Sequence, residues 1–397
     1  MNPLSRKFII PGVLIVALFV LAPTAWALVG EGIDFELTQT SEYWVNTIGG
    51  LKRQQTYLKN LDVIGSLDTA ETGLWENGHF LIHLLMTDGG KKLSAEITGD
   101  IQTASNIEAP RTFRLFEASY EHIFLQKKLS SRAGILDMNS DFYVSEYAGL
   151  FINSSFGIGP EVSSGARPSI FTLASLGARL RYNLNERWQW LGGVYDGDPG
   201  DPEKNEHYPD IRLTTDQGAF IINEVIYSSG TAGDSLPGTI KIGYWHNSGD
   251  FEHLTALDSS GNPLIRRHNR GGYIIADKLI YQEKENQGLG CFLQAGKSRN
   301  SLNEVSLYSG GGLHYTGLIP GRDKDIFGLA VAHAMLSPDL SSQDDRYRSE
   351  TTGEWTYRAQ VNNHIILQPN MQFILHPGAD KTLNNAFISG LRLEIFF

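Results

Sequence analysis

One pair of short motifs carries the residue types of a serine hydrolase. Residues 233–236 read Gly-Asp-Ser-Leu and residues 250–253 read Asp-Phe-Glu-His, so Ser235 and His253 could act as nucleophile and general base. Enzymes that use these two motifs carry the serine near the start of the chain and the histidine near its end. Here both motifs flank one expected hairpin in mid-chain, which favours a structural reading and predicts that the chain is not an enzyme.

Two further groups have spacings that resemble metal sites. His79 and His83 are four residues apart, but an expected strand carries them, and Phe80 stands where a metalloprotease helix needs glutamate. The residues Asp196, Asp198 and Asp201 carry oxygen ligands of the kind that Ca²⁺ uses, without a bidentate glutamate at the right offset. The sequence therefore predicts that the two histidines lie in a protein core or point into the lumen of a β-barrel, and that the three aspartates form a plain turn. It predicts no metal and no cofactor.

The N-terminus has the pattern of a secretory signal peptide. Arg6 and Lys7 precede the apolar run 8–21, and Ala25-Trp26-Ala27 is a small-residue cleavage site. We expect residues 1–27 to be removed. The formal charge of the whole chain is −11, and loss of Arg6 and Lys7 makes it more negative. Such a balance argues against nucleic acid as a partner.

The mature chain has the composition of an all-β protein. The whole chain carries 42 glycines, 11% aromatic residues, 19% charged residues and a single cysteine, so no internal disulfide can staple it. We read residues 28–50 as a periplasmic lead-in, because they are acidic and carry no basic residue. Segments of about ten residues then recur from Leu51 onward between Gly, Pro, Asp and Asn clusters, which predicts strands in one domain over 51–397. The expected strands, near sixteen in number if 362–376 holds two, are 52–65, 78–88, 113–126, 128–137, 172–184, 187–196, 217–228, 237–247, 271–282, 288–298, 303–317, 323–336, 350–360, 362–376 and 384–397.

The last strand shows how the two faces differ. Leu391, Leu393, Ile395 and Phe397 fall on one face and Arg392 and Glu394 on the other, since side chains alternate along an extended chain. Similar alternation sets apolar residues against polar or small ones at 116–121, 176–182, 240–244 and 327–332. A soluble sandwich shows the same pattern, but the leader, the aromatic strand ends and the aromatic terminus favour a transmembrane antiparallel β-barrel. We expect it to close by pairing this last strand with one that begins near Leu51.

The connections between the expected strands differ in length. Residues 138–171, 197–216 and 248–270 form long connections, as the outer loops of such barrels do. The apolar content of 147–158 gives the first of these loops two readings, a surface loop or a loop that folds into the lumen and narrows it.

Five stretches, in the same order along the chain, resemble the OprB family of carbohydrate-selective porins. They are 102–122, GLFINSSFGIGPE (149–161), VYDGDPGDP (194–202), 312–334 with YTGLIPGRDKD, and 354–380 with LQPNMQFILHPG. The sequence departs from the family pattern at Trp355-Thr356-Tyr357 and at Asn362-Asn363-His364, positions that bear on the substrate rather than on the fold. The resemblance implies a sixteen-stranded outer-membrane porin, in a Gram-negative bacterium, that passes small sugars such as glucose by passive diffusion. It also implies that the barrel assembly machinery recognises the terminal Phe397.

A sugar pore needs groups in its lumen that bind hydroxyls and let them go again. The candidates, taken from the polar strand faces, the long loop and the family stretch at 312–334, are Glu117, Glu121, Arg132, Asp137, Asn139, Asp141, Phe142, Arg179, Arg181, Arg322, Asp325, Arg358, Arg392 and Glu394. Asn153 is a further loop candidate, and Arg114 joins Glu117 on one face only if the strand bends between them. An excess of lumen arginine would suit neutral or anionic solutes.

Two other functions remain open at this point. One is a porin of the same fold with general or anion selectivity. The other is a secreted β-rich protein that binds or cleaves polysaccharide, with acidic residues forming a carboxylate pair. The expected partners are small sugars and outer-membrane lipid, and the barrel is expected to be a monomer or a homotrimer.

Overall fold

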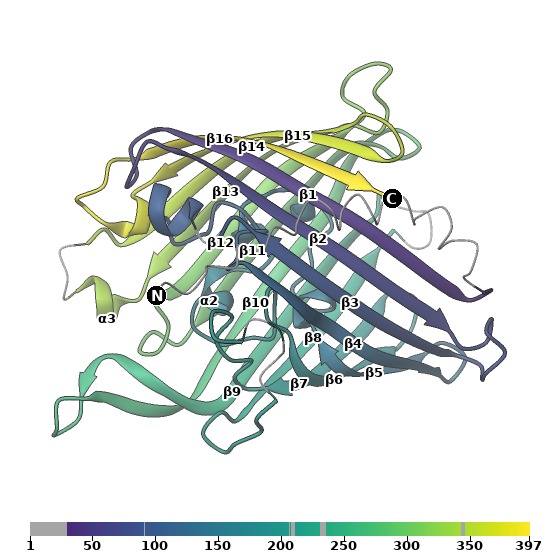
Figure 1. The fold of residues 1–397 in the computed structure, drawn as a ribbon, viewed down its shortest axis with the longest axis horizontal. Helices are drawn as coiled ribbons and strands as arrows, with labels where there is room; N and C mark the ends of the chain where they lie inside the picture. The colour runs from purple at the N-terminus through teal and green to yellow at the C-terminus, as the bar shows by residue number, and fades with distance from the viewer. Residues whose placement is uncertain (1–29, 91, 206, 208–210, 231–235, 343–345) are drawn as a thin grey trace, which may run out of the picture.

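A computed structural model describes residues 30–397 except 91, 206, 208–210, 231–235 and 343–345. In this part of the chain sixteen antiparallel strands, each paired with its neighbours in sequence, close into one barrel (Figure 1). The strands are β1 (Ile33–Ile48), β2 (Gln55–Asp68), β3 (Gly78–Asp88), β4 (Thr112–Phe124), β5 (Leu129–Leu136), β6 (Ser175–Asn183), β7 (Trp188–Asp196), β8 (Ala219–Ser229), β9 (Gly238–Leu257), β10 (Pro263–Lys284), β11 (Gln287–Ser298), β12 (Val305–Thr316), β13 (Ile326–Leu336), β14 (Ser349–Gln360), β15 (Ile365–Leu375) and β16 (Ala386–Phe396). The predicted fold class, an all-β transmembrane barrel of about sixteen strands, is confirmed.

Short helical segments lie in the connections. They are the π-helix η2 (Leu93–Thr98), the 3-10 turns η3 (Met138–Ser140), η4 (Ala148–Leu150), η5 (Ser154–Phe156) and η6 (Pro377–Ala379), and the α-helical turns α2 (Pro160–Ser163) and α3 (Pro338–Ser341). No helix in the described ranges is long and apolar enough to cross a membrane. The predicted signal peptide and Ser235 lie outside the described residues.

The barrel closes through a strand that the sequence reading missed. β16 pairs with β1, from Thr38 opposite Phe396 to Ile48 opposite Phe387, and not with β2. The periplasmic lead-in expected over 28–50 was therefore wrong, and so was the closing strand expected near Leu51. Four acidic residues suggested a lead-in. Glu31 precedes β1, whereas Asp34, Glu36 and Glu42 share the strand face of the buried Trp44, opposite the exposed Phe35 and Tyr43, and point inward, where charge is tolerated. β1 also brings the number of strands to sixteen, because 362–376 holds one strand, β15, and not two.

The two ends of the barrel differ as the loop lengths predict. The connections 125–128, 184–187, 285–286 and 361–364 leave one end, where β1 begins and β16 ends. The long connections 89–111, 137–174, 197–218 and 337–348 leave the other end, beyond which β9 and β10 continue as a projecting hairpin (Figure 1, lower left). Short turns face the periplasm in barrels of this type, so the long loops are extracellular.

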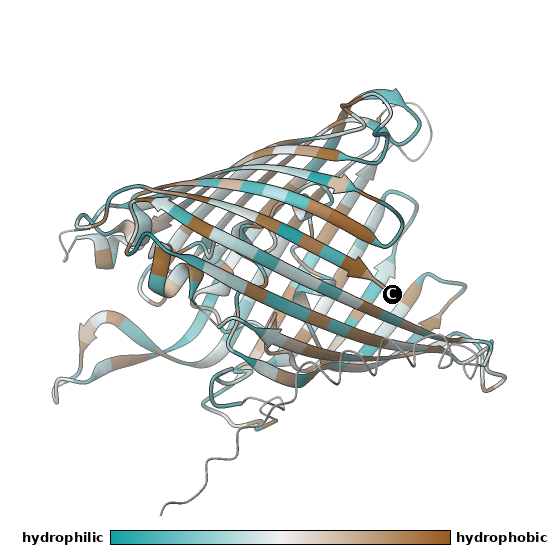
Figure 2. Ribbon diagram, turned by 45° about the horizontal axis from the view of Figure 1, so that its top comes forward, coloured by the Kyte–Doolittle hydropathy of each residue, from teal (hydrophilic) through white to brown (hydrophobic). Residues whose placement is uncertain are grey.

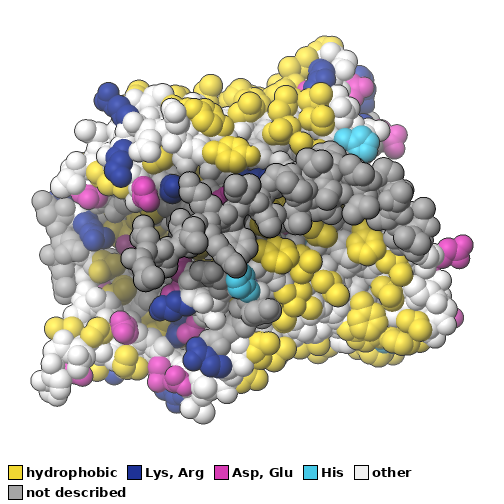
Figure 3. Space-filling model, viewed as in Figure 1, with side chains coloured by type: hydrophobic (Ala, Val, Ile, Leu, Met, Phe, Trp, Pro, Cys, Tyr) yellow, Lys and Arg dark blue, Asp and Glu magenta, His cyan; other side chains and the backbone are white. Residues whose placement is uncertain are grey.

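The strand faces follow the predicted alternation. Leu180, Ile242 and Leu391 point outward and are 44%, 60% and 47% exposed. Arg179 points in the opposite direction to Leu180 on β6, and Arg392 in the opposite direction to Leu391 on β16. Both arginines point inward and are buried. Figure 2 shows hydrophobic and hydrophilic residues alternating along the strands, and Figure 3 shows hydrophobic side chains gathered over the outer wall. This apolar outer wall is the surface that lipid covers in a membrane barrel.

Phe116 departs from the alternation, and the cause is a β-bulge. His83 of β3 pairs with Glu117 of β4, but Leu84 pairs with Leu115, so Phe116 is the extra residue. Phe116 was expected on the apolar outer face; it is instead buried against the ring of His83, with centroids 5.2 Å apart. A bulge changes the phase of a strand, and it supplies the bend that Arg114 needed to join Glu117 on the inner face.

The seam between β1 and β16 should depend on one buried ion pair. Glu42 is fully buried; Oε1 accepts a bond from Arg392 Nε at 2.6 Å, and Oε2 accepts one from Trp44 Nε1 at 2.6 Å. Loss of one partner leaves the other charge buried and unpaired. We expect Glu42→Gln to lower the free energy of unfolding by roughly 2–4 kcal/mol, measured by urea unfolding in detergent. Glu36→Gln, on the same face of β1 but exposed, should change it little; equal stability of the two variants would refute this role.

Candidate functional site in the lumen

The long connection between β5 and β6, residues 137–174, folds back into the barrel. Its aromatic residues Phe151 and Phe156 are buried and pack on Phe292 of β11, with ring centroids 5.6 and 5.8 Å away. Of the two readings of 147–158, the inward one is confirmed. We call residues 137–174 the constriction loop.

Carboxylates on the inner wall hold the backbone of this loop. Glu354 of β14 accepts hydrogen bonds from the amides of Ile152 and Asn153, at 2.7 and 2.9 Å. Asp277 of β10 accepts one from Ser145 Oγ at 2.6 Å. Six strands lie between β5 and β14 one way round the barrel and eight the other, so the loop crosses nearly the whole lumen. Bonds to charged groups are the stronger ones, which makes this crossing a fixed feature of the pore.

A second inward connection, residues 89–111, narrows the lumen further. The amide of Asn106 donates to Ile152 O at 2.8 Å, and the amide of Ser154 donates to Thr103 O at 3.0 Å. The two loops are therefore joined by backbone hydrogen bonds, and the open path is confined to the space that they leave.

Six of the predicted residues form a single ionic network on one side of the constriction loop. We call it the arginine cluster; it consists of Arg132, Arg179, Arg181, Glu117, Glu121 and Asp141. Asp141, on the loop, pairs with Arg181 at 2.7 Å, with Arg179 at 3.1 Å and with Arg132 at 3.8 Å.

The strand carboxylates complete the arginine cluster. Glu117 pairs with Arg132 at 3.2 Å and Glu121 with Arg179 at 3.1 Å. Of the three arginines, Arg181 is the most exposed, with 36% of its side chain accessible, whereas Arg179 is almost fully buried. Arg181 can therefore meet a solute directly, while Arg179 holds the wall and loop together.

Three more predicted residues lie in a second group near the closing seam. Arg358 pairs with Glu394 at 3.0 Å, and Arg392 binds both Glu42 and, through Nη2, Asn106 of the second inward connection. This seam group lies on the strands β14, β16 and β1. Both groups thus tie strand side chains to an inward loop.

Asp137 and Asn139 brace the start of the constriction loop. The amide of Asp137 donates to Glu117 Oε1 at 2.9 Å, and Asp137 Oδ1 accepts the amide of Asn139 at 2.9 Å. Burial, and then the neighbouring Glu117 carboxylate, raise the pKa of Asp137 to about 7. Asn139 Nδ2 donates to Phe142 O at 3.1 Å, so its amide shapes the loop.

Besides Asp137 and Asn139, four further predicted residues lie outside both groups. Phe142 has no exposed surface and packs on Tyr195, and Asn153 is fully buried, so neither can touch a solute in this conformation. Arg322 and Asp325 pair at 2.7 Å in the periplasmic connection between β12 and β13, where Asp325 also accepts a bond from Tyr357 at 2.6 Å. The sequence stretch that carries them is a turn, so the structure places them away from the constriction.

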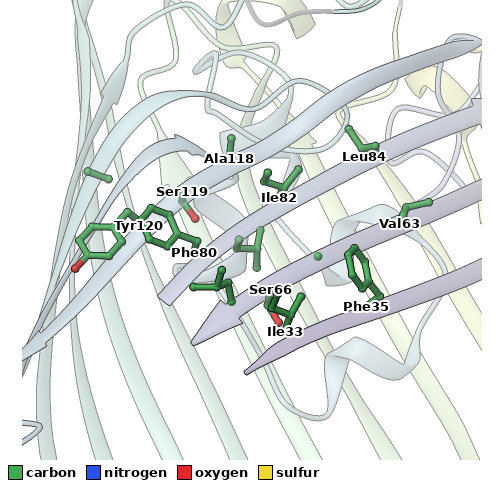
Figure 4. Close-up of a pocket in the computed structure, with 14 residues that line it drawn as sticks. Ile33, Phe35, Val63, Ser66, Phe80, Ile82, Leu84, Ala118, Ser119 and Tyr120 are labelled. Carbon is green, nitrogen blue, oxygen red and sulfur yellow. The ribbon is translucent and has the colours of Figure 1, made fainter. Parts of the chain in front are cut away.

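A large hollow on the outer wall is not the polar site. It has a volume of about 620 Å³ and is lined from β1 to β5 by apolar residues that include Phe35, Ile82 and Tyr120 (Figure 4). Phe35 and Ile82 belong to the lipid-facing side of their strands. A sugar needs hydrogen-bond partners, and these lie in the lumen.

The model of the family described as "Carbohydrate-selective porin, OprB family" matches residues 52–397. The chain belongs to this family. It is a sugar-selective porin of the Gram-negative outer membrane.

Curated relatives and solved structures agree with that assignment. Porin B of Pseudomonas aeruginosa is 22% identical over 408 residues, which cover 93% of this chain and 88% of that protein. The protein described as "Putative porin QuiX" of Acinetobacter baylyi is 21% identical over 403 residues, which cover 92% of this chain and 90% of that protein. The high-pH structure of Pseudomonas putida OprB superposes with a TM-score of 0.80 at 21% identity over 97% of both chains, which shows a common fold.

The sequence reading missed the residues that anchor the loops. Glu354 and Asp277 were not among the candidates, nor was Lys241, whose Nζ donates to Val144 O at 2.6 Å. All three lie on inward strand faces; alternation at 240–244 carried that signal for Lys241, whereas the faces of 273–281, which holds Asp277, are mixed. What alternation does not supply is which of the inward charges face the loop.

The Glu354 carboxylate should be what keeps the constriction loop across the lumen. Glu354→Ala removes acceptors from two buried backbone amides, each bond to a charged group being worth about 1.5–3 kcal/mol. We expect a larger single-channel conductance in planar bilayers. Glu394→Ala, which removes an inner-wall carboxylate that contacts arginines instead of the loop, should leave the conductance close to that of the unaltered protein. A larger conductance in Glu394→Ala than in Glu354→Ala would show that the loop is held elsewhere.

Ion selectivity should change with pH through Asp137. A carboxyl whose pKa is about 7 is largely neutral at pH 6 and largely ionised at pH 8, so raising the pH adds negative charge beside the arginine cluster. We expect stronger cation preference at pH 8, measured as a shift of the reversal potential in a KCl gradient. Glu161 of the same loop also has a pKa of about 7, raised by burial, so Asp137→Asn should reduce the shift rather than abolish it. An undiminished shift in this variant would exclude Asp137 as a contributor.

Proposed function

We propose that this porin passes glucose-like monosaccharides and other small sugars by passive diffusion, with Arg181 of the arginine cluster as the main solute-facing group. The observation that carries the proposal is charge balance. The arginine cluster contains three arginines and three carboxylates, and the pairs of the seam group, Arg358–Glu394 and Arg392–Glu42, are balanced as well. The arginine excess that the sequence suggested is thus neutralised by paired acids.

A balanced lumen favours neutral solutes over anions. An unpaired cluster of arginines would attract anions by net charge, whereas paired arginines and carboxylates still offer donors and acceptors to neutral hydroxyls. Charge-assisted hydrogen bonds of this kind replace part of the water that a sugar loses when it enters. Because the arginines already hold carboxylates, the binding is weak enough for the sugar to leave, as transport requires.

We infer that the same groups perform no covalent chemistry. Glu117 and Glu121 each hold an arginine, which supports a binding role for these carboxylates rather than a role in acid–base catalysis. We also propose that membrane lipid covers the outer wall and that the barrel assembly machinery recognises the C-terminal strand. A monomer and a homotrimer are both compatible with this pore.

Sugar block of the current through single channels tests the assignment. We expect glucose to reduce the current more than phosphate does, and Arg181→Ala to weaken the glucose block roughly fivefold, which corresponds to the loss of about 1 kcal/mol from one hydrogen bond. Lys127→Ala, at an exposed periplasmic turn, is the matched control, and glucose should block its current as it blocks that of the unaltered protein.

The alternative selectivities predict other results in the same experiment. Equal block by glucose and phosphate would indicate a general porin, and stronger block by phosphate would indicate an anion channel. Unchanged glucose block in Arg181→Ala would remove this residue from the binding site.

A further inference from the structure

A group of basic side chains faces outward on three neighbouring strands, away from the lumen. The inner face of this region is fixed by Trp245 and Tyr273, which are buried inside the barrel. Their neighbours on the other strand face therefore point outward; they are His246 of β9 and, opposite it in the β9–β10 ladder, Arg270 of β10. Lys297 of β11 is exposed and pairs with Gly272, so it points outward as well.

Two further basic residues join this group through side-chain contacts. His268 Nδ1 lies 3.2 Å from His246 Nε2, and the two rings are stacked 5.2 Å apart. The guanidinium of Arg299 donates to the carbonyls of Arg267 and His268, both at 3.2 Å. We call the group the outer basic patch; its members are His246, His268, Arg270, Lys297 and Arg299.

The outer basic patch differs from the lumen groups in its charge balance. None of its three permanently charged members, Arg270, Lys297 and Arg299, forms an ion pair with a described residue. The nearby acidic residue Asp250 is already paired with Arg267 at 2.8 Å. The patch is therefore a net positive surface, whereas each lumen arginine of the two inner groups is matched.

The height of the patch on the barrel places it at the outer membrane surface. β9 begins at the periplasmic end at Gly238, and its outward residues Ile240, Ile242 and Tyr244 are 46–60% exposed. A transmembrane strand needs about 9–11 residues to cross the hydrocarbon core, so His246 stands where the core ends. Tyr244 directly below it fits the aromatic girdle at that interface.

We propose that the outer basic patch binds the phosphate groups of a phosphorylated glycolipid in the outer leaflet. Phosphate oxygens accept the charge-assisted hydrogen bonds that arginine and lysine donate. Each basic residue beside a membrane surface contributes a similar free energy of attraction to anionic headgroups, so the contributions of several neighbouring residues add up. The apolar residues below the patch contact the acyl chains of the same lipid, which distinguishes this ligand from a free anion.

Lipid binding to the intact barrel in detergent tests the proposal. Native mass spectrometry would compare lipid A that carries two phosphates, the same lipid with its phosphates removed, and inorganic phosphate alone. We expect the phosphorylated lipid to bind best, and Arg270→Gln combined with Lys297→Gln to weaken its binding tenfold or more. Lys127→Gln combined with Lys128→Gln, which removes the same charge from the periplasmic end, should bind like the unaltered protein.

Every other result contradicts the proposal. Equal binding of the two lipids would mean that acyl chains alone bind, equally tight binding of inorganic phosphate would mean that the patch is an anion site, and equal loss in both double variants would mean a general charge effect. Heat-modifiable migration on a gel checks that each variant is folded. If the double variant does not fold, Arg270→Gln and Lys297→Gln are measured singly, each with several-fold weaker lipid binding expected. Glucose block should stay unchanged in all of them, which separates this surface from the lumen.

Discussion

The whole structure depends on the requirement that backbone groups in lipid be hydrogen-bonded within the protein. A strand edge left open in the hydrocarbon core would expose a row of unpaired amides and carbonyls, each costing several kcal/mol. The β1–β16 seam removes that edge. Closure also decides where charge can go, since each strand then has one face toward lipid and one toward water. The ionic groups of the lumen are a consequence of that division.

Inside the closed wall, polar residues are used to hold backbone as well as to meet solute. Glu354 and Asp277 bind amides and a hydroxyl of the constriction loop, and Glu350 binds the amides of Ile101 and Gln102 in the second inward connection. A loop inside a barrel carries amides that no strand ladder satisfies, and buried unpaired amides are costly. Inward carboxylates satisfy several of them at once, so a narrow pore requires acidic residues that never touch the solute.

The sequence predicts those features that repeat locally and misses those that depend on partners. Alternation with a period of two located the strands, and it assigned Arg179, Arg181 and Arg392 to the inner face. β1 was not predicted because the composition of its segment, with several acidic residues and no basic one, suggested exposure to solvent. Its acidic residues Asp34, Glu36 and Glu42 are nevertheless spaced by even numbers, which places them on one strand face. The bulge at Phe116 follows from the pairing of β3 with β4, and the burial of Phe142 follows from the path of the constriction loop. Neither is encoded within a single strand, so strand-by-strand reading could not supply them.

Asp141 shows why the shape of this pore and its selectivity are one problem. It belongs to the constriction loop, yet it is bound by arginines from β5 and β6. Its pairing fastens the loop to the wall, and its charge balances the arginines there. A lumen without this carboxylate would have a displaced loop and a positive wall together, so pore width and anion preference would change in the same step. The proposed preference for neutral sugars would then depend on the same contact that holds the constriction loop in place.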